Sequence, residues 1–202
     1  MTRREKLFAE PFEPERAAVI ARNFPYFARL GADDQRELLG HVRVFLDEKS
    51  FEGCGGLELT DEIKLTIAAQ ACLLLLHRET DYYPGLDAIL VYPHAYRAKG
   101  VERAGGGVVL EREQVRLGES HRQGIVVLSW DAVKRGAVDD VDGHNVVLHE
   151  FAHKLDKEDG AADGAPVLRR RSSYGPWARV LGAEFEALTE ATRENRETDI
   201  DS

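Results

Sequence analysis

Cysteine is scarce in this chain of 202 residues, which contains only Cys54 and Cys72. The two residues lie in separate parts of the sequence and form no Cys-x-x-Cys pair. Neither a disulfide framework nor a structural zinc site closed by several cysteines is therefore expected. Both thiols fit a reducing cytoplasm, and we expect them to pack as small apolar side chains.

Long hydrophobic runs are also missing. The apolar run that ends in Leu73–Leu76 is too short to cross a bilayer, which takes about 20 residues. A signal peptide is not expected either, because acidic residues and prolines between positions 10 and 14 interrupt the segment after the basic N-terminus. The sequence therefore predicts a cytoplasmic protein with no membrane partner.

An excess of positive charge is the third absence. The chain has 27 Lys and Arg against 36 Asp and Glu, a formal net charge of −9. A nucleic-acid surface would normally show as a basic patch, and the one basic run, Arg169–Arg171, is typical of a solvated loop. Direct nucleic-acid binding is not expected. A composition of 43% hydrophobic and 31% charged residues favours one globular domain over residues 1–202.

The pattern His-Glu-x-x-His lies in the segment Val146–Asp156, at His149, Glu150 and His153. Residues four apart on an α-helix lie on the same face, so both imidazoles can bind one metal ion. Zn²⁺ binds neutral histidine nitrogens, and catalytic zinc sites leave one position open for water. Glu150 suits the general base that takes a proton from that water. The pattern predicts one Zn²⁺ per chain and metal-assisted hydrolysis.

The surrounding residues favour a helix that packs on a core. Asp142 is a candidate N-cap, and the apolar residues recur with helical spacing at Val147, Leu148, Phe151, Ala152 and Leu155. The alternative to a metal site is a pair of histidines that make ordinary hydrogen bonds on a buried helix.

Two further carboxylates are candidates for the same site. Asp156, one turn after His153, can accept the second ring N–H of that histidine and fix its tautomer; the alternative is a solvent-facing residue at the helix end. Glu184 lies among the apolar residues of a long helix expected to start near Ser172–Pro176. Buried carboxylates are rare unless paired or metal-bound, so Glu184 is a weak candidate for a third zinc ligand. A salt bridge to a neighbouring arginine is the alternative.

The rest of the pattern favours an α+β fold. Residues 1–100 are expected to be mostly helical, and residues 101–202 to contain strands, the metal-binding helix and a long C-terminal helix. The expected helices and strands cover Pro14–Leu30 with a break at Pro25, Asp33–Lys49, the residues after a Thr60 cap, Ala88–Tyr92, an edge strand over Val109–Leu117 and an interior strand over Gly124–Trp130.

Segments spread over most of the chain carry a family resemblance: Gly55–Glu58, Thr60–Glu62, Ile67–Leu75, Asp81–Leu86, Gly118–Ser120, Val127–Asp131 and Asp142–Asp156. By these segments the chain resembles the Mlc titration factor A family of gluzincin-type zinc metallopeptidases, which are bacterial cytosolic proteins.

The resemblance implies a zincin-like metallopeptidase fold, mainly helical, with a small mixed sheet beside the metal-binding helix. By position it implies that His149 and His153 are zinc ligands and that Glu150 is the base. It also implies hydrolysis of peptides, aminopeptidase-like in preferring short or N-terminally presented substrates, and binding to a glucose-responsive transcriptional repressor. A regulatory protein that sequesters the repressor without catalysis is therefore the alternative to a peptidase.

The sequence departs from the family pattern at its C-terminus. Family members place a glutamate ligand on a further helix, shortly after an Ile/Leu-Asp-x-Tyr segment that Ile200–Ser202 resembles only at its opening. The resemblance implies that the third ligand and the closing helix lie past Ser202, and that Glu184 is not that ligand. Weak zinc retention and low or no peptidase activity are expected for these 202 residues.

Overall fold

The computed structural model covers residues 1–202 and describes all of them except 105–107, 117, 120–123, 140–142, 159, 161–163, 165, 169, 195 and 197–202; between 96 and 119 it describes the backbone alone. Some residues singled out from the sequence lie outside the described residues: Leu117, Ser120, Asp142, Arg169 and Ile200–Ser202.

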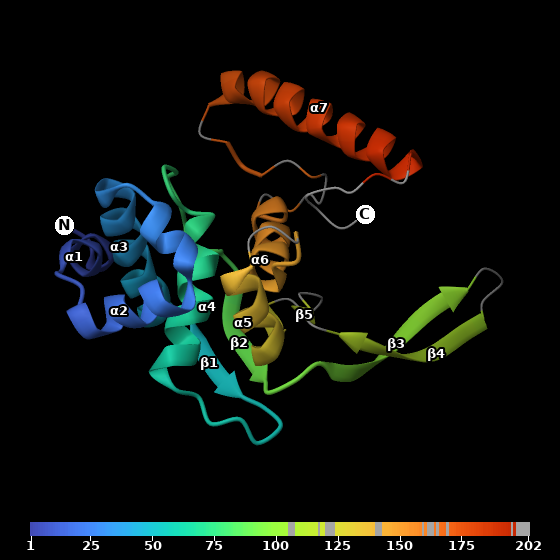
Figure 1. Ribbon diagram of the computed structural model, residues 1–202, viewed down its shortest axis with the longest axis horizontal. Coiled ribbons are helices and arrows are strands. Elements are labelled where there is room, and N and C mark those ends of the chain that lie inside the picture. The colour runs from blue at the N-terminus through green and yellow to red at the C-terminus, as the bar shows by residue number, and fades with distance from the viewer. Residues whose placement is uncertain are drawn as a thin grey trace.

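The N-terminal part is mainly helical. Its helices are α1 (Arg3–Ala9), α2 (Pro14–Asn23), the 3-10 helix η1 (Pro25–Arg29), α3 (Ala32–Glu48) and α4 (Asp61–Leu73). All of them except α1 lie in segments that were expected to be helical. Pro25 marks the break after α2, and the Thr60 hydroxyl caps α4 by accepting a hydrogen bond from the backbone N–H of Ile63 at 3.3 Å. Helix α4 is buried along almost its whole length, and α2 and α3 both pack against it (Figure 1).

A small mixed sheet lies beside α4. Its order is β1 (Ser50–Gly53), β2 (Leu86–Tyr92), β6 (Gly124–Ser129) and β5 (Gly118–Glu119), in which β1, β2 and β6 are parallel and β5 is antiparallel to β6. The central strands β2 and β6 supply fully buried side chains to the core, among them Ile89 and Val126. The predicted α+β class with a small mixed sheet is confirmed.

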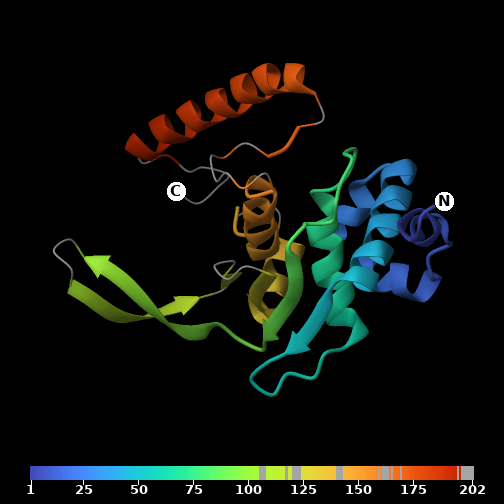
Figure 2. The same cartoon turned by 180° about the vertical axis from the view of Figure 1, so that it is seen from behind.

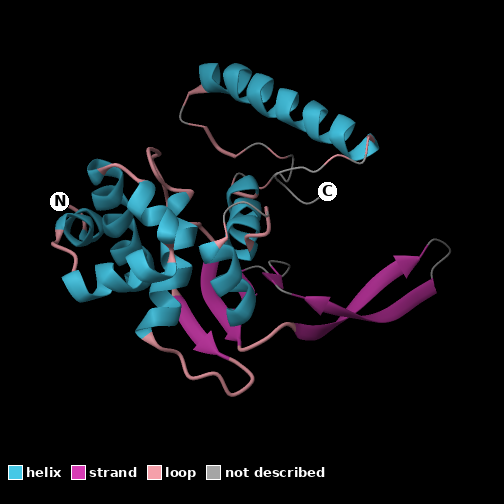
Figure 3. Cartoon of the chain, viewed as in Figure 1, coloured by secondary structure: helices cyan, strands magenta, loops and turns pink. Residues whose placement is uncertain are grey.

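Strands β3 (Tyr96–Ala104) and β4 (Val108–Arg116) form a separate antiparallel hairpin that extends away from the helices and the sheet (Figure 3). The strand over Val109–Leu117 was expected, whereas β3 was not. Polar residues and Gly100 interrupt any apolar alternation in β3, so its sequence carries no clear strand pattern.

The C-terminal part contains α5 (Trp130–Val138), α6 (Val146–Asp156), the 3-10 helix η2 (Arg171–Ser173) and α7 (Tyr174–Arg193). Helix α7 lies apart from the other helices in both views and packs mainly against η2 (Figures 1 and 2). The burial expected of its apolar face is wrong, because Val180 and Leu181 are 60% and 45% exposed. No helix among the described residues is long and apolar enough to cross a bilayer.

Candidate metal-binding helix

The inner face of α6 is anchored by aromatic rings. Phe151 is fully buried, and its ring centroid lies 5.7 Å from that of Phe45 on α3 and 4.8 Å from that of Tyr83. The Tyr83 hydroxyl donates a hydrogen bond of 2.6 Å to the carbonyl of Ala71 on α4. Because this ring cluster joins three segments, it fixes both the height and the rotation of α6 against the core.

The N-terminus of α6 is fixed by one amide side chain. Asn145 accepts a hydrogen bond of 2.9 Å from the backbone N–H of Leu148, and its amide nitrogen donates to Gln70 Oε1 at 2.9 Å and to the Gly136 carbonyl at 2.7 Å. The expected cap at Asp142 is therefore wrong: the helix begins at Val146, and the residue directly before it performs the capping.

Replacing Asn145 with alanine is expected to destabilise the fold by about 1–2 kcal/mol, because the cap is lost and the buried amide of Gln70 loses a partner. Urea unfolding followed by circular dichroism measures this change. Asn145→Ser, which keeps a capping oxygen, should recover part of the loss. Equal destabilisation by both variants would show that the links to Gln70 and Gly136, rather than the cap, hold the helix end.

The outer face of α6 presents the two histidines of the motif. Both side chains are exposed, their ring centroids are 4.6 Å apart, and the Nε2 atoms are 3.2 Å apart. Two nitrogens that each lie about 2.0–2.1 Å from a tetrahedral zinc ion are roughly 3.4 Å apart. The geometry of His149 and His153 therefore fits the binding of one ion by both Nε2 atoms.

Glu150 occupies the same helical turn but is only 7% exposed. One turn further on, Lys154 donates a hydrogen bond of 3.2 Å to the carbonyl of Ile125 on β6. Burial lowers the pKa of Lys154, the nearby charge of Lys157 lowers it further, and the negative charge of Glu150 opposes both effects. This part of α6 thus combines the exposed imidazole nitrogens of two histidines with a carboxylate that is shielded from bulk water. The positively charged Lys154 side chain lies one turn further on.

The other two candidate residues, Asp156 and Glu184, do not lie beside the histidine pair of α6. Asp156 Oδ1 accepts a hydrogen bond of 2.6 Å from the backbone N–H of Gly164, so the carboxylate holds the loop after α6. Glu184 is exposed on α7, and the buried environment predicted for it is wrong. Among the described residues, no third His, Cys, Asp or Glu places a donor atom within 4.8 Å of both histidines. The described part of the chain thus offers two candidate ligands at this position.

Gln70 is a supporting residue that belongs to no recognisable site motif in the sequence. Its side chain is fully buried, donates to the carbonyl of Thr66 at 3.0 Å and accepts from Asn145. The signal in the sequence was a single amide within the apolar run Ile67–Leu76. A buried amide of this kind needs partners on neighbouring elements.

A helix that exposes two histidines one turn apart around a buried glutamate is the arrangement of metallopeptidases that carry the His-Glu-x-x-His motif. The whole chain, residues 1–202, matches the glucose-regulated metallo-peptidase M90 family, and the chain belongs to that family.

Similar proteins agree with this assignment. The chain is 40% identical over 200 residues to an uncharacterized protein of Synechocystis, a match that covers 98% of the chain and 73% of the relative. It is 34% identical over 165 residues to Mlc titration factor A of Klebsiella pneumoniae, covering 81% of the chain and 61% of that protein. Over 178 residues it is 32% identical to Mlc titration factor A of Edwardsiella ictaluri, covering 88% and 65%. The predicted family resemblance is confirmed, and these matches span about three fifths to three quarters of each relative.

Proposed function

We propose that the chain is the metal-binding part of a zinc-dependent peptidase in which His149 and His153 hold one Zn²⁺ and Glu150 is the general base. The observation that carries the proposal is the 3.2 Å separation of the two exposed Nε2 atoms on α6, with the carboxylate of Glu150 buried in the same turn. The family of metallo-peptidases to which the chain belongs supports the same reaction class.

The chemistry follows from the placement of these side chains. The bound ion would supply Lewis-acid activation of the attacking water and of the scissile carbonyl. Glu150 takes the proton of that water and passes it to the leaving amine, and its low exposure keeps the carboxylate from being fully hydrated. The packing of Phe151 against the aromatic cluster fixes the position of α6, and therefore of Glu150, relative to the core.

Zinc retention by the 202-residue chain is expected to be weak and its peptidase activity low, because catalytic zinc sites use three protein ligands and the described residues supply two. A glutamate outside the described residues is the proposed third ligand, as the family resemblance implies. We place the protein in the cytoplasm, with short or N-terminally presented peptides as substrates.

A second function is favoured by the relatives that carry the name Mlc titration factor A. In this alternative, the chain binds and sequesters a glucose-responsive transcriptional repressor, and catalysis is not needed. The two functions use different surfaces if the repressor does not contact the outer face of α6.

Replacing both His149 and His153 with alanine distinguishes these functions. Peptide cleavage should become undetectable, because the pair is the proposed metal anchor, whereas repressor binding measured by calorimetry should stay within twofold if titration needs no metal. His144→Ala, which removes an exposed histidine just before α6, is the matched control. Cleavage that survives the double substitution would refute the peptidase proposal.

A further inference from the structure

A second group of metal-ligating side chains lies where the start of α3 meets the turn that follows α4. Asp34 and Glu37 come from α3 and His77 comes from the turn, and one donor atom of each lies within 4.8 Å of the other two. We propose that Asp34, Glu37 and His77 bind a divalent transition-metal ion, separately from the histidine pair on α6.

The distances between these donors suit an ion. Asp34 Oδ1 lies 3.3 Å from His77 Nε2, close to the roughly 3.4 Å between two ligands of a tetrahedral zinc ion. Glu37 Oε2 lies 3.4 Å from His77 Nδ1, and Glu37 Oε1 accepts the backbone N–H of His77 at 2.7 Å. One ring nitrogen of His77 can therefore share an ion with one oxygen of each carboxylate, while Glu37 Oε1 also holds the backbone of His77 in place.

A buried histidine holds Glu37 in place. His41 lies one turn after Glu37 on α3 and is only 6% exposed, with Nδ1 at 2.9 Å from the Tyr82 hydroxyl. Its Nε2 lies 3.5 Å from Glu37 Oε1, so His41 links the carboxylate of Glu37 to the buried Tyr82 hydroxyl. His41 is thus a positioning residue for Glu37 and is not one of the proposed ligands.

The group offers two carboxylates and one imidazole. This donor set suits Zn²⁺, Mn²⁺, Fe²⁺ or Co²⁺ better than the all-oxygen preference of Ca²⁺.

The surroundings allow an ion to enter. Glu37, His41 and Arg78 line a cavity of about 790 Å³ beside α1 and α3, and His77 itself is exposed. The positive charges of Arg36 and Arg78, which also line this cavity, oppose a cation here. Both charges are compensated, because Arg36 forms an ion pair with Asp33 and Arg78 donates a hydrogen bond of 2.9 Å to Glu158 after α6.

The test uses a protein that has lost the other candidate site. In the His149→Ala/His153→Ala background, Co²⁺ titrated as the probe should bind at one ion per chain, as read by calorimetry and by visible absorbance. Adding His77→Asn should weaken this binding by about tenfold or more, since losing a ligand or its orienting partner typically costs that much. Asparagine is chosen because it tolerates the left-handed backbone of His77, which has φ of 60°.

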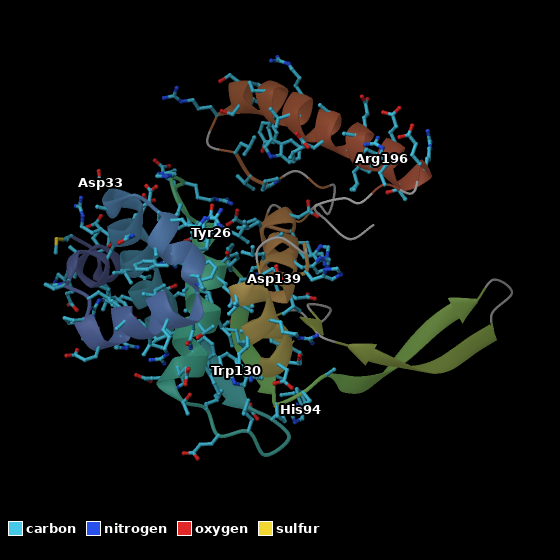
Figure 4. All side chains as sticks on the ribbon, viewed as in Figure 1. Tyr26, Asp33, His94, Trp130, Asp139 and Arg196 are labelled. Atoms are coloured by element: carbon cyan, nitrogen blue, oxygen red, sulfur yellow. The ribbon has the colours of Figure 1, made fainter. Side chains whose placement is uncertain are left out.

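Asp33→Asn is the matched control. Asp33 lies at the exposed start of α3 and forms an ion pair with Arg36 (Figure 4). Its substitution by asparagine removes the same negative charge as Asp34→Asn does. It should leave Co²⁺ affinity within twofold, whereas Asp34→Asn should weaken it as His77→Asn does. Circular dichroism melts establish that each variant is folded.

Two results would overturn the proposal. The first is no Co²⁺ binding in the folded background protein, which would make the group a set of ion pairs around His77. The second is binding that His77→Asn and Asp34→Asn leave unchanged. Both results are independent of the proposed peptidase, because the background lacks the histidines of α6.

Discussion

Replacing Glu150 with glutamine is expected to lower kcat/KM for peptide cleavage by about 10²- to 10⁴-fold, the contribution typical of a positioned general base. Glutamine keeps the size of the buried side chain but cannot accept the proton of the attacking water. Zinc affinity should change little, because the ligand atoms belong to His149 and His153. Cleavage of one fluorogenic peptide by zinc-saturated protein, at high enzyme concentration, measures the effect.

The control for this substitution is Glu186→Gln, which changes the same functional group on the exposed surface of α7. It should alter neither cleavage nor zinc affinity. The base assignment fails if Glu150→Gln retains cleavage within tenfold of the starting protein. Loss of zinc together with cleavage would instead mean that Glu150 takes part in holding the ion.

Replacing Phe151 with alanine is expected to reduce the free energy of unfolding by about 3–5 kcal/mol, the range for large-to-small changes of fully buried aromatic residues. The phenyl ring contacts Phe45 and Tyr83, so its removal leaves a cavity between α3, α6 and the segment before β2. Domains of this size are stable by about 5–15 kcal/mol, so the variant should be close to unfolding at 37 °C. Urea denaturation at 25 °C gives the change.

Ala152→Ser is the companion control, because residue 152 is the exposed neighbour of Phe151 on the same helix. Its effect should stay within about 0.5 kcal/mol, as is usual for surface substitutions. A loss below 1 kcal/mol for Phe151→Ala would show that the ring cluster is not what holds α6 to the core.

Helix α6 was predictable because its evidence is local. The histidine spacing and the apolar stripe both lie within one short segment, and the structure forms α6 over Val146–Asp156, although the helix starts later than a cap at Asp142 would give. The N-cap of α4 at Thr60 and the break at Pro25 were predictable for the same reason. The roles proposed for His149, Glu150 and His153 stay predictions, which the substitutions above test.

Features that depend on distant residues were not predictable. Helix α7 has the apolar periodicity of a helix that packs on a core. In the described part of the chain, however, its main contact is with η2, and much of its apolar face is exposed. The group of Asp34, Glu37 and His77 is absent from any motif, because its members come from two segments that meet only after α3 packs on α4. Periodicity reports which face could be buried, and it does not report what covers that face.

The side chain of Asn145 joins α4, α5 and α6 through Gln70, Gly136 and its own cap. An ion that binds His149 and His153 only while α6 is formed must, by thermodynamic linkage, favour the state in which this three-helix junction is closed. The reverse also holds, so loosening the junction should make zinc dissociate more readily. If His149 and His153 bind zinc as proposed, we expect substitution of Gln70, which donates to neither histidine, to weaken that binding from a distance.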